Sequence, residues 1–92
     1  MDEKVELSLY VNGMNTTSNL IFAKLIKMCD EQFGDSYKLN LVDLRKEPEA
    51  GIKEKIIVLP TLVREYPRPE IRVTGDLTKI KKVMLTLELL PG

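Results

Sequence analysis

The sequence contains no histidine, no tryptophan and a single cysteine, Cys29. The absence of histidine removes the side chain that most often acts as a general base or as a metal ligand. One cysteine cannot form an internal disulfide or a four-ligand zinc site. These absences favour a domain without catalysis, and we expect it to carry no cofactor and no metal.

The sequence also lacks an excess of charge of either sign and a long apolar run. Lys and Arg total 14, as do Asp and Glu, so charge gives no reason to expect nucleic acid or an anionic membrane as a partner. Lys and Glu interrupt every apolar stretch before it reaches transmembrane length. The charged residues 1–4 lack the apolar segment of a signal peptide, and we expect a cytoplasmic protein.

The length and the apolar content of the chain predict one small folded domain. Of its 92 residues, 43% are apolar and 30% are charged, which is ordinary for a globular protein. We therefore expect a single domain over residues 1–92.

The first half of the chain has the pattern of a βαβ unit. Apolar and polar residues alternate over residues 5–11, which predicts a strand with one buried face. Residues 20–33 have helical spacing and end at Gly34, a typical residue after a helix. Residues 37–44 alternate again, so the two strands should be parallel. Possible N-caps of the helix are Thr16, Thr17 and Ser18, and its inward face contains Ile21, Leu25, Met28, Cys29 and Gln32.

The second half begins with a weak helical segment at residues 45–55. Pro48 suits the first helical position, whereas Gly51 costs about 1 kcal/mol relative to alanine inside a helix. Residues 61–65 and 70–74 have strand character, and we expect them to be antiparallel across a turn.

That turn, and the start of the last predicted helix, are set by proline, glycine and aspartate. Pro67 and Pro69 oppose helix, because each biases the residue before it toward extended geometry. After Gly75, Asp76 is a good N-cap for a helix over residues 77–90. The predicted element order is βαβαββα.

Residues 83–90 fit two patterns. As a helix, this segment buries Val83, Met84, Leu87 and Leu90. As a strand, it places three leucines on one face, Leu85, Leu87 and Leu89. Periodicity alone cannot separate these alternatives, although helix propensity and Asp76 favour the helix.

The predicted order βαβαββα is similar to that of the thioredoxin-like fold, which implies a cis Leu59–Pro60 bond. A thioredoxin-like oxidoreductase needs a reactive thiolate at the start of its first helix. Residues 14–18 contain no cysteine there, and the pattern favours Cys29 as a buried small apolar residue. A redox or thiol-binding function therefore remains only as an alternative.

Four motifs, in order and with consistent spacing over residues 7–90, resemble the KaiB family of circadian clock proteins. They are Leu-Tyr-Val-x-Gly at 9–13, Asp-Leu-x-Lys-x-Pro at 43–48, Leu-Pro-Thr-Leu at 59–62 and Gly-Asp-Leu at 75–77, the last followed by Lys-Val at 82–83 and Leu-Glu-Leu-Leu at 87–90. The resemblance implies a non-enzymatic regulator that binds a KaiC-type ATPase and can capture KaiA. Another use of this domain is in clock histidine kinases. A KaiB-like domain without a clock role is a further alternative.

The same resemblance implies two folds, a thioredoxin-like monomer and a tetrameric ground fold with the order βαββααβ. We expect the monomer at rest. The implied switch positions are Pro60, Pro67, Pro69, Gly75 and Asp76. We expect partner binding along the second strand and the following segment, at Lys38, Asn40, Lys46 and Lys55, because an edge strand offers unpaired backbone groups.

Overall fold

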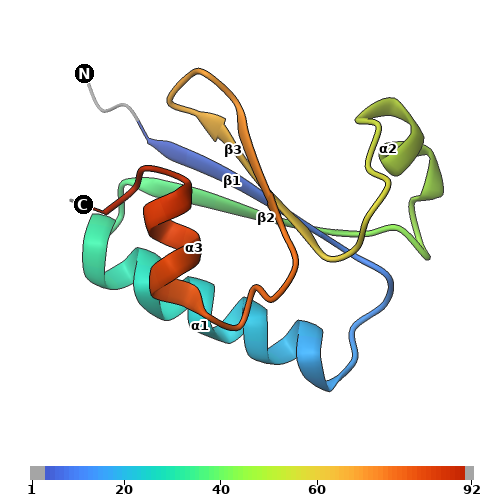
Figure 1. Ribbon diagram of the computed structural model, residues 1–92, viewed down its shortest axis with the longest axis horizontal. Helices are drawn as coiled ribbons and strands as arrows, with labels where there is room; N and C mark the ends of the chain where they lie inside the picture. Colours follow the sequence, from blue (N-terminus) through green and yellow to red (C-terminus); the bar gives the residue numbers. More distant parts are fainter. Residues whose placement is uncertain (1–3, 91–92) are drawn as a thin grey trace.

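The computed structural model describes residues 4–90, so residues 1–3, with most of the charged N-terminal stretch, and residues 91–92 lie outside the described part. The elements follow the predicted order βαβαββα (Figure 1). Their bounds are Val5–Val11 (β1), Thr16–Phe33 (α1), Tyr37–Asp43 (β2), Pro48–Lys53 (α2), Thr61–Tyr66 (β3), Ile71–Thr74 (β4) and Ile80–Thr86 (α3).

The four strands form one sheet in the order β2-β1-β3-β4. As predicted, β1 and β2 are parallel, and β3 and β4 form an antiparallel hairpin. The two halves of the chain meet where β1 pairs antiparallel with β3, and Leu9 lies between Leu41 on one side and Leu62 on the other. Strands β2 and β4 are therefore the edges of the sheet.

Helices α1 and α3 cover the same face of the sheet, whereas α2 lies beyond the end at which β1 and β2 finish (Figure 1). The core between helices and sheet is aliphatic, and burying each leucine fully contributes about 1.5–3 kcal/mol. Its buried members are Leu7, Leu9, Val11, Ile21, Leu25, Met28, Cys29, Leu62, Leu77, Val83, Met84 and Leu87.

The first helix begins one turn earlier than predicted, at Thr16. Its N-cap is Asn15, whose side-chain oxygen accepts a hydrogen bond from the Ser18 backbone at 2.8 Å. The N-caps predicted at positions 16–18 are wrong, because those residues already belong to the helix. Asn is as good an N-cap as Ser, so Asn15 takes the position immediately before them.

The buried face of α1 is largely as predicted, but its limits differ. Gln32 is exposed although the spacing placed it inward, and Leu20 is 46% exposed. Both side chains therefore lie outside the buried face of the helix. The predicted positions that are buried are Ile21, Leu25, Met28 and Cys29.

Helix α3 is shorter than the predicted span of residues 77–90. Asp76 is not its N-cap, because its carboxylate accepts hydrogen bonds from the backbone and the hydroxyl of Thr78 instead. These bonds close a local turn, and the helix starts later, after Lys79. Its buried residues, Val83 and Met84, are nevertheless predicted ones, and Leu87 just after the helix is also buried, whereas Leu90 is only partly buried.

Helix α2 starts at Pro48 as predicted and contains Gly51. A Cβ at Gly51 would lie 2.7 Å from Leu44 Cδ1. The close approach of this helix to Leu44 therefore accounts for a glycine that helix propensity alone disfavours.

The prolines lie at both ends of β3. The Leu59–Pro60 bond that precedes the strand is cis, as expected. Pro67 and Pro69 form the turn to β4, and both are also preceded by cis bonds.

Candidate partner-binding surface

Lys38 and Asn40 lie on the edge strand β2, as predicted, but only the side chain of Lys38 is exposed to solvent. Lys38 is exposed opposite Glu6 of β1. Asn40 is half-buried, and its side-chain amide donates to the Ser8 hydroxyl at 3.3 Å. Ser8 in turn donates to Glu65 at 2.6 Å. This chain of hydrogen bonds crosses three strands on the face that α1 and α3 leave open.

Lys46 and Lys55 lie beyond the other end of β2. Both are exposed, Lys46 in the turn before α2 and Lys55 just after that helix. A strand rises about 3.3 Å per residue, so Lys38 is roughly 16 Å from the end of β2 at Asp43. The predicted residues therefore form two groups, one along the strand edge and one around α2.

The most exposed large apolar side chains lie beside Lys55, and the sequence analysis missed them as a binding feature. The exposed fraction is 80% for Ile52, 92% for Ile57 and 52% for Val58. We define the α2–β3 surface by Ile52, Lys55, Ile57 and Val58. The only signal in the sequence is the apolar run before Pro60, which is equally typical of a buried segment.

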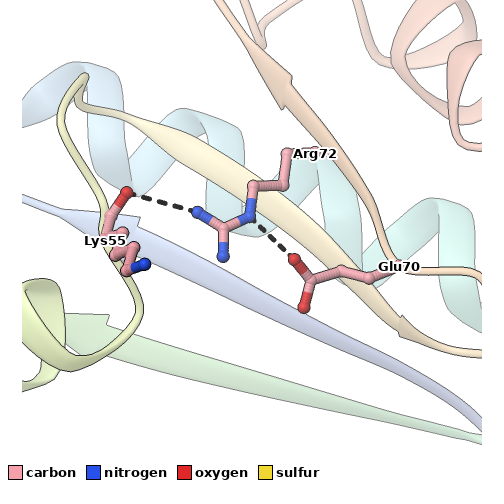
Figure 2. A network of polar contacts seen from close by, with 3 residues as sticks. All are labelled: Lys55, Glu70 and Arg72. Carbon is pink, nitrogen blue, oxygen red and sulfur yellow. Dashed lines mark hydrogen bonds and ion pairs between the residues drawn. The ribbon is translucent and has the colours of Figure 1, made fainter.

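The backbone at Lys55 is held by Arg72 of β4 (Figure 2). Arg72 Nη1 donates to the Lys55 carbonyl at 3.4 Å, and Arg72 Nε forms an ion pair with Glu70 at 2.8 Å. The ion pair is partly exposed, so it contributes at most about 1 kcal/mol. Its role is geometric, since it directs the guanidinium toward the α2–β3 surface.

A cavity of about 270 Å³ lies next to Pro60, at the N-terminus of α1. It is the position at which a thioredoxin-like enzyme would carry its thiolate, and Asn15, Thr17 and Ser18 line it instead. Nearby, Asp43 accepts hydrogen bonds from the backbone of Arg45 and of Gly13, and these bonds lower the pKa of its carboxyl group. The carboxylate thus joins the loop after β1 to the loop after β2.

Cys29 is fully buried in α1, roughly 20 Å along the helix from its first residue at about 1.5 Å per residue. Burial raises the pKa of its thiol to about 11. A buried thiol with a raised pKa contains little of the reactive thiolate.

We therefore expect no turnover of a disulfide substrate by this protein. The measurement is insulin reduction with dithiothreitol, followed by turbidity, and a thioredoxin serves as the positive control. Turnover that is present in the parent protein and lost in Cys29→Ala would contradict the expectation.

Within residues 4–90, no three acidic or cysteine side chains gather closely enough to hold a metal ion. In the same part of the chain, no helix has both the length and the apolar content needed to cross a bilayer.

Comparison with known proteins finds one domain family, described as the KaiB domain, which matches residues 8–89. The circadian clock protein KaiB3 of Synechocystis is 34% identical over 88 residues, which cover 96% of this chain and 86% of that protein.

Solved structures with the same fold include the following two. The N-terminal domain of SasA from Synechococcus elongatus has a TM-score of 0.76 at 19% identity, and the match covers 100% of this chain and 90% of that domain. A chloroplastic thioredoxin z has a TM-score of 0.71 at 18% identity, covering 95% of this chain and 79% of that one. The fold is therefore thioredoxin-like.

Proposed function

Because this chain belongs to the KaiB family of circadian clock proteins, we propose that it is a non-enzymatic regulator that binds a KaiC-type ATPase. The observation that supports this proposal is the α2–β3 surface. Three aliphatic side chains that are half to nearly fully exposed lie beside Lys55, and such a combination is typical of an interface with a polar rim.

In this proposal the ATPase contacts the α2–β3 surface, with Lys46 at its border. The edge of β2 is a second contact region, because its outer backbone groups have no strand partner within residues 4–90. An extended segment of another clock protein, such as a KaiA-like protein, could pair with it by strand addition. Lys38 lies on that edge.

The double variant Lys55→Glu/Ile57→Asp tests the main contact. Both side chains are exposed, so we expect the fold to be retained. Loss of an apolar anchor and reversal of a charge at an interface centre should weaken ATPase binding by about 30-fold or more. The measurement is biolayer interferometry with the immobilised KaiC-type ATPase of the same organism.

The matched control for that experiment is Lys81→Glu, which also reverses a surface lysine but lies on α3. It should bind as the parent protein does, and Lys38→Glu reports separately on the β2 edge. Unchanged binding by the double variant, with the far-ultraviolet circular dichroism of the parent, would place the contact elsewhere.

We also propose that residues 61–90 can refold on partner binding or release. The thioredoxin-like form described here is then the resting monomer, and the tetrameric order βαββααβ is the alternative. Two features support this proposal: residues 83–90 fit both helix and strand, and the backbone at Gly75 has a φ of +99°. Two folds of one sequence can differ by only a few kcal/mol. The response to substitution of Leu85 and Leu87 distinguishes the two folds.

A further inference from the structure

A second surface lies on the helix layer, between α1 and α3. It is a groove of about 420 Å³. Met28, which is 8% exposed, and the half-buried Ile80 provide its apolar side chains. We call it the α1–α3 groove, and its lining residues are Lys24, Lys27, Met28, Glu31, Ile80 and Lys81.

The lysines of the groove form no ion pair with the carboxylates of the described residues. Within residues 4–90, no carboxylate lies within ion-pair distance of Lys24, Lys27 or Lys81. Lys24 is held in place, because its Nζ donates to the Thr78 carbonyl at 3.0 Å across the gap between the helices. Glu31 also lines the groove and is the one acidic side chain among its described lining residues.

The surrounding helix surface adds further positive charge. Lys79 and Lys82 flank the other side of α3, together with Asp76. The Asp76 carboxylate already accepts two hydrogen bonds from Thr78, and these lower its pKa. Although the net charge of the chain is zero, three lysines line the α1–α3 groove, and two more lie on the other side of α3.

We propose that the α1–α3 groove binds an acidic segment of a partner protein, in which an apolar side chain is flanked by carboxylates. The apolar side chain would contact Met28 and Ile80, and the carboxylates would pair with the lysines. The apolar floor of the groove complements the apolar side chain, and the lysines without an ion-pair partner complement the carboxylates. The groove shares no residue with the α2–β3 surface, so the proposal does not depend on ATPase binding.

The test is a titration of the ¹⁵N-labelled full-length protein with a synthetic peptide, Glu-Glu-Leu-Glu-Glu-Leu-Glu-Glu, followed by NMR. We expect saturable chemical-shift changes centred on Lys27, Met28 and Ile80. The double variant Lys27→Glu/Lys81→Glu should weaken binding by about tenfold or more. The matched control Lys4→Glu/Lys53→Glu changes two exposed lysines and the net charge equally, lies outside the groove and should bind as the parent does.

Specificity is tested with two further ligands under the same conditions, a peptide in which serine replaces each leucine and inorganic polyphosphate. Weaker binding of both supports the proposal, because neither carries the apolar side chain. The proposal is overturned if the leucine peptide causes no saturable change, if the control variant loses as much affinity as the groove variant, or if polyphosphate binds equally well. The groove variant should still bind the KaiC-type ATPase. A failure of the groove proposal can therefore be distinguished from a failure of the proposed ATPase binding.

Discussion

Replacement of Arg64 by alanine is expected to lower the free energy of unfolding by about 2–4 kcal/mol. Arg64 is 4% exposed in the middle of β3. Its guanidinium donates to the carbonyl of Leu87 and to the carbonyl of Pro69, each at 2.8 Å. It therefore connects the end of α3 to the β3–β4 turn, and the substitution leaves both carbonyls without this partner.

The position of the charge adds to the effect. Leu87 is the residue at the C-terminal end of α3, where the helix dipole favours a cation. The Arg64 Nε atom is buried without a hydrogen-bond partner, which reduces the net gain. Arg64→Met should lose less than Arg64→Ala, because both remove the buried charge but methionine keeps more of the packing of the side chain.

Urea unfolding followed by circular dichroism measures these differences. The matched control is Arg68→Ala, an exposed arginine of the β3–β4 turn, which should change stability by no more than about 0.5 kcal/mol. Equal stability of the Arg64→Ala and Arg68→Ala variants would show that the buried guanidinium does not stabilise the fold.

The second large effect is expected at Leu87, and its neighbour Leu85 provides the comparison. Leu87, directly after the last residue of α3, is fully buried, whereas Leu85 within the helix is 45% exposed. Leu87→Ala should cost about 2–5 kcal/mol because it leaves a cavity. Leu85→Ala should cost less than about 1 kcal/mol.

This contrast reports the fold at rest. In a terminal strand, Leu85 and Leu87 would share one face with Leu89 and would lose similar amounts of stability on substitution. Urea unfolding gives the two losses, and NMR secondary shifts over Ile80–Thr86 give an independent measurement. Equal losses, strand shifts and a tetrameric mass would show that the thioredoxin-like monomer is not the resting form.

The sequence predicts the element order well because each element follows a local rule. Alternation identifies β1, and Gly34 marks the end of α1. The predicted start of α3 is wrong for a local reason as well. The backbone and the hydroxyl of Thr78 both donate to Asp76, and the turn that these bonds close competes with the N-cap geometry.

The binding features were harder to predict because exposure is a tertiary property. Lys38 and Lys55 could be proposed as exposed from charge alone. The apolar Ile57 could not, since its exposure depends on which element passes over it. The inward orientation of Arg64 follows from strand alternation, because Arg64 shares a strand face with Leu62 and therefore points toward the helix layer.

The sheet order has a consequence for how the molecule can come apart. Strands β1 and β2 both belong to the first half of the chain, and β3 and β4 both belong to the second. Between these strands, the single pairing of β1 with β3 joins the halves. The sheet thus consists of a parallel pair and an antiparallel hairpin that meet at one strand pairing, and the contact of α1 with α3 also joins the two halves of the chain. Under the refolding proposed for residues 61–90, the pairing of β1 with β3 and the packing of α1 against α3 would have to break, whereas the parallel pairing of β1 with β2 would not.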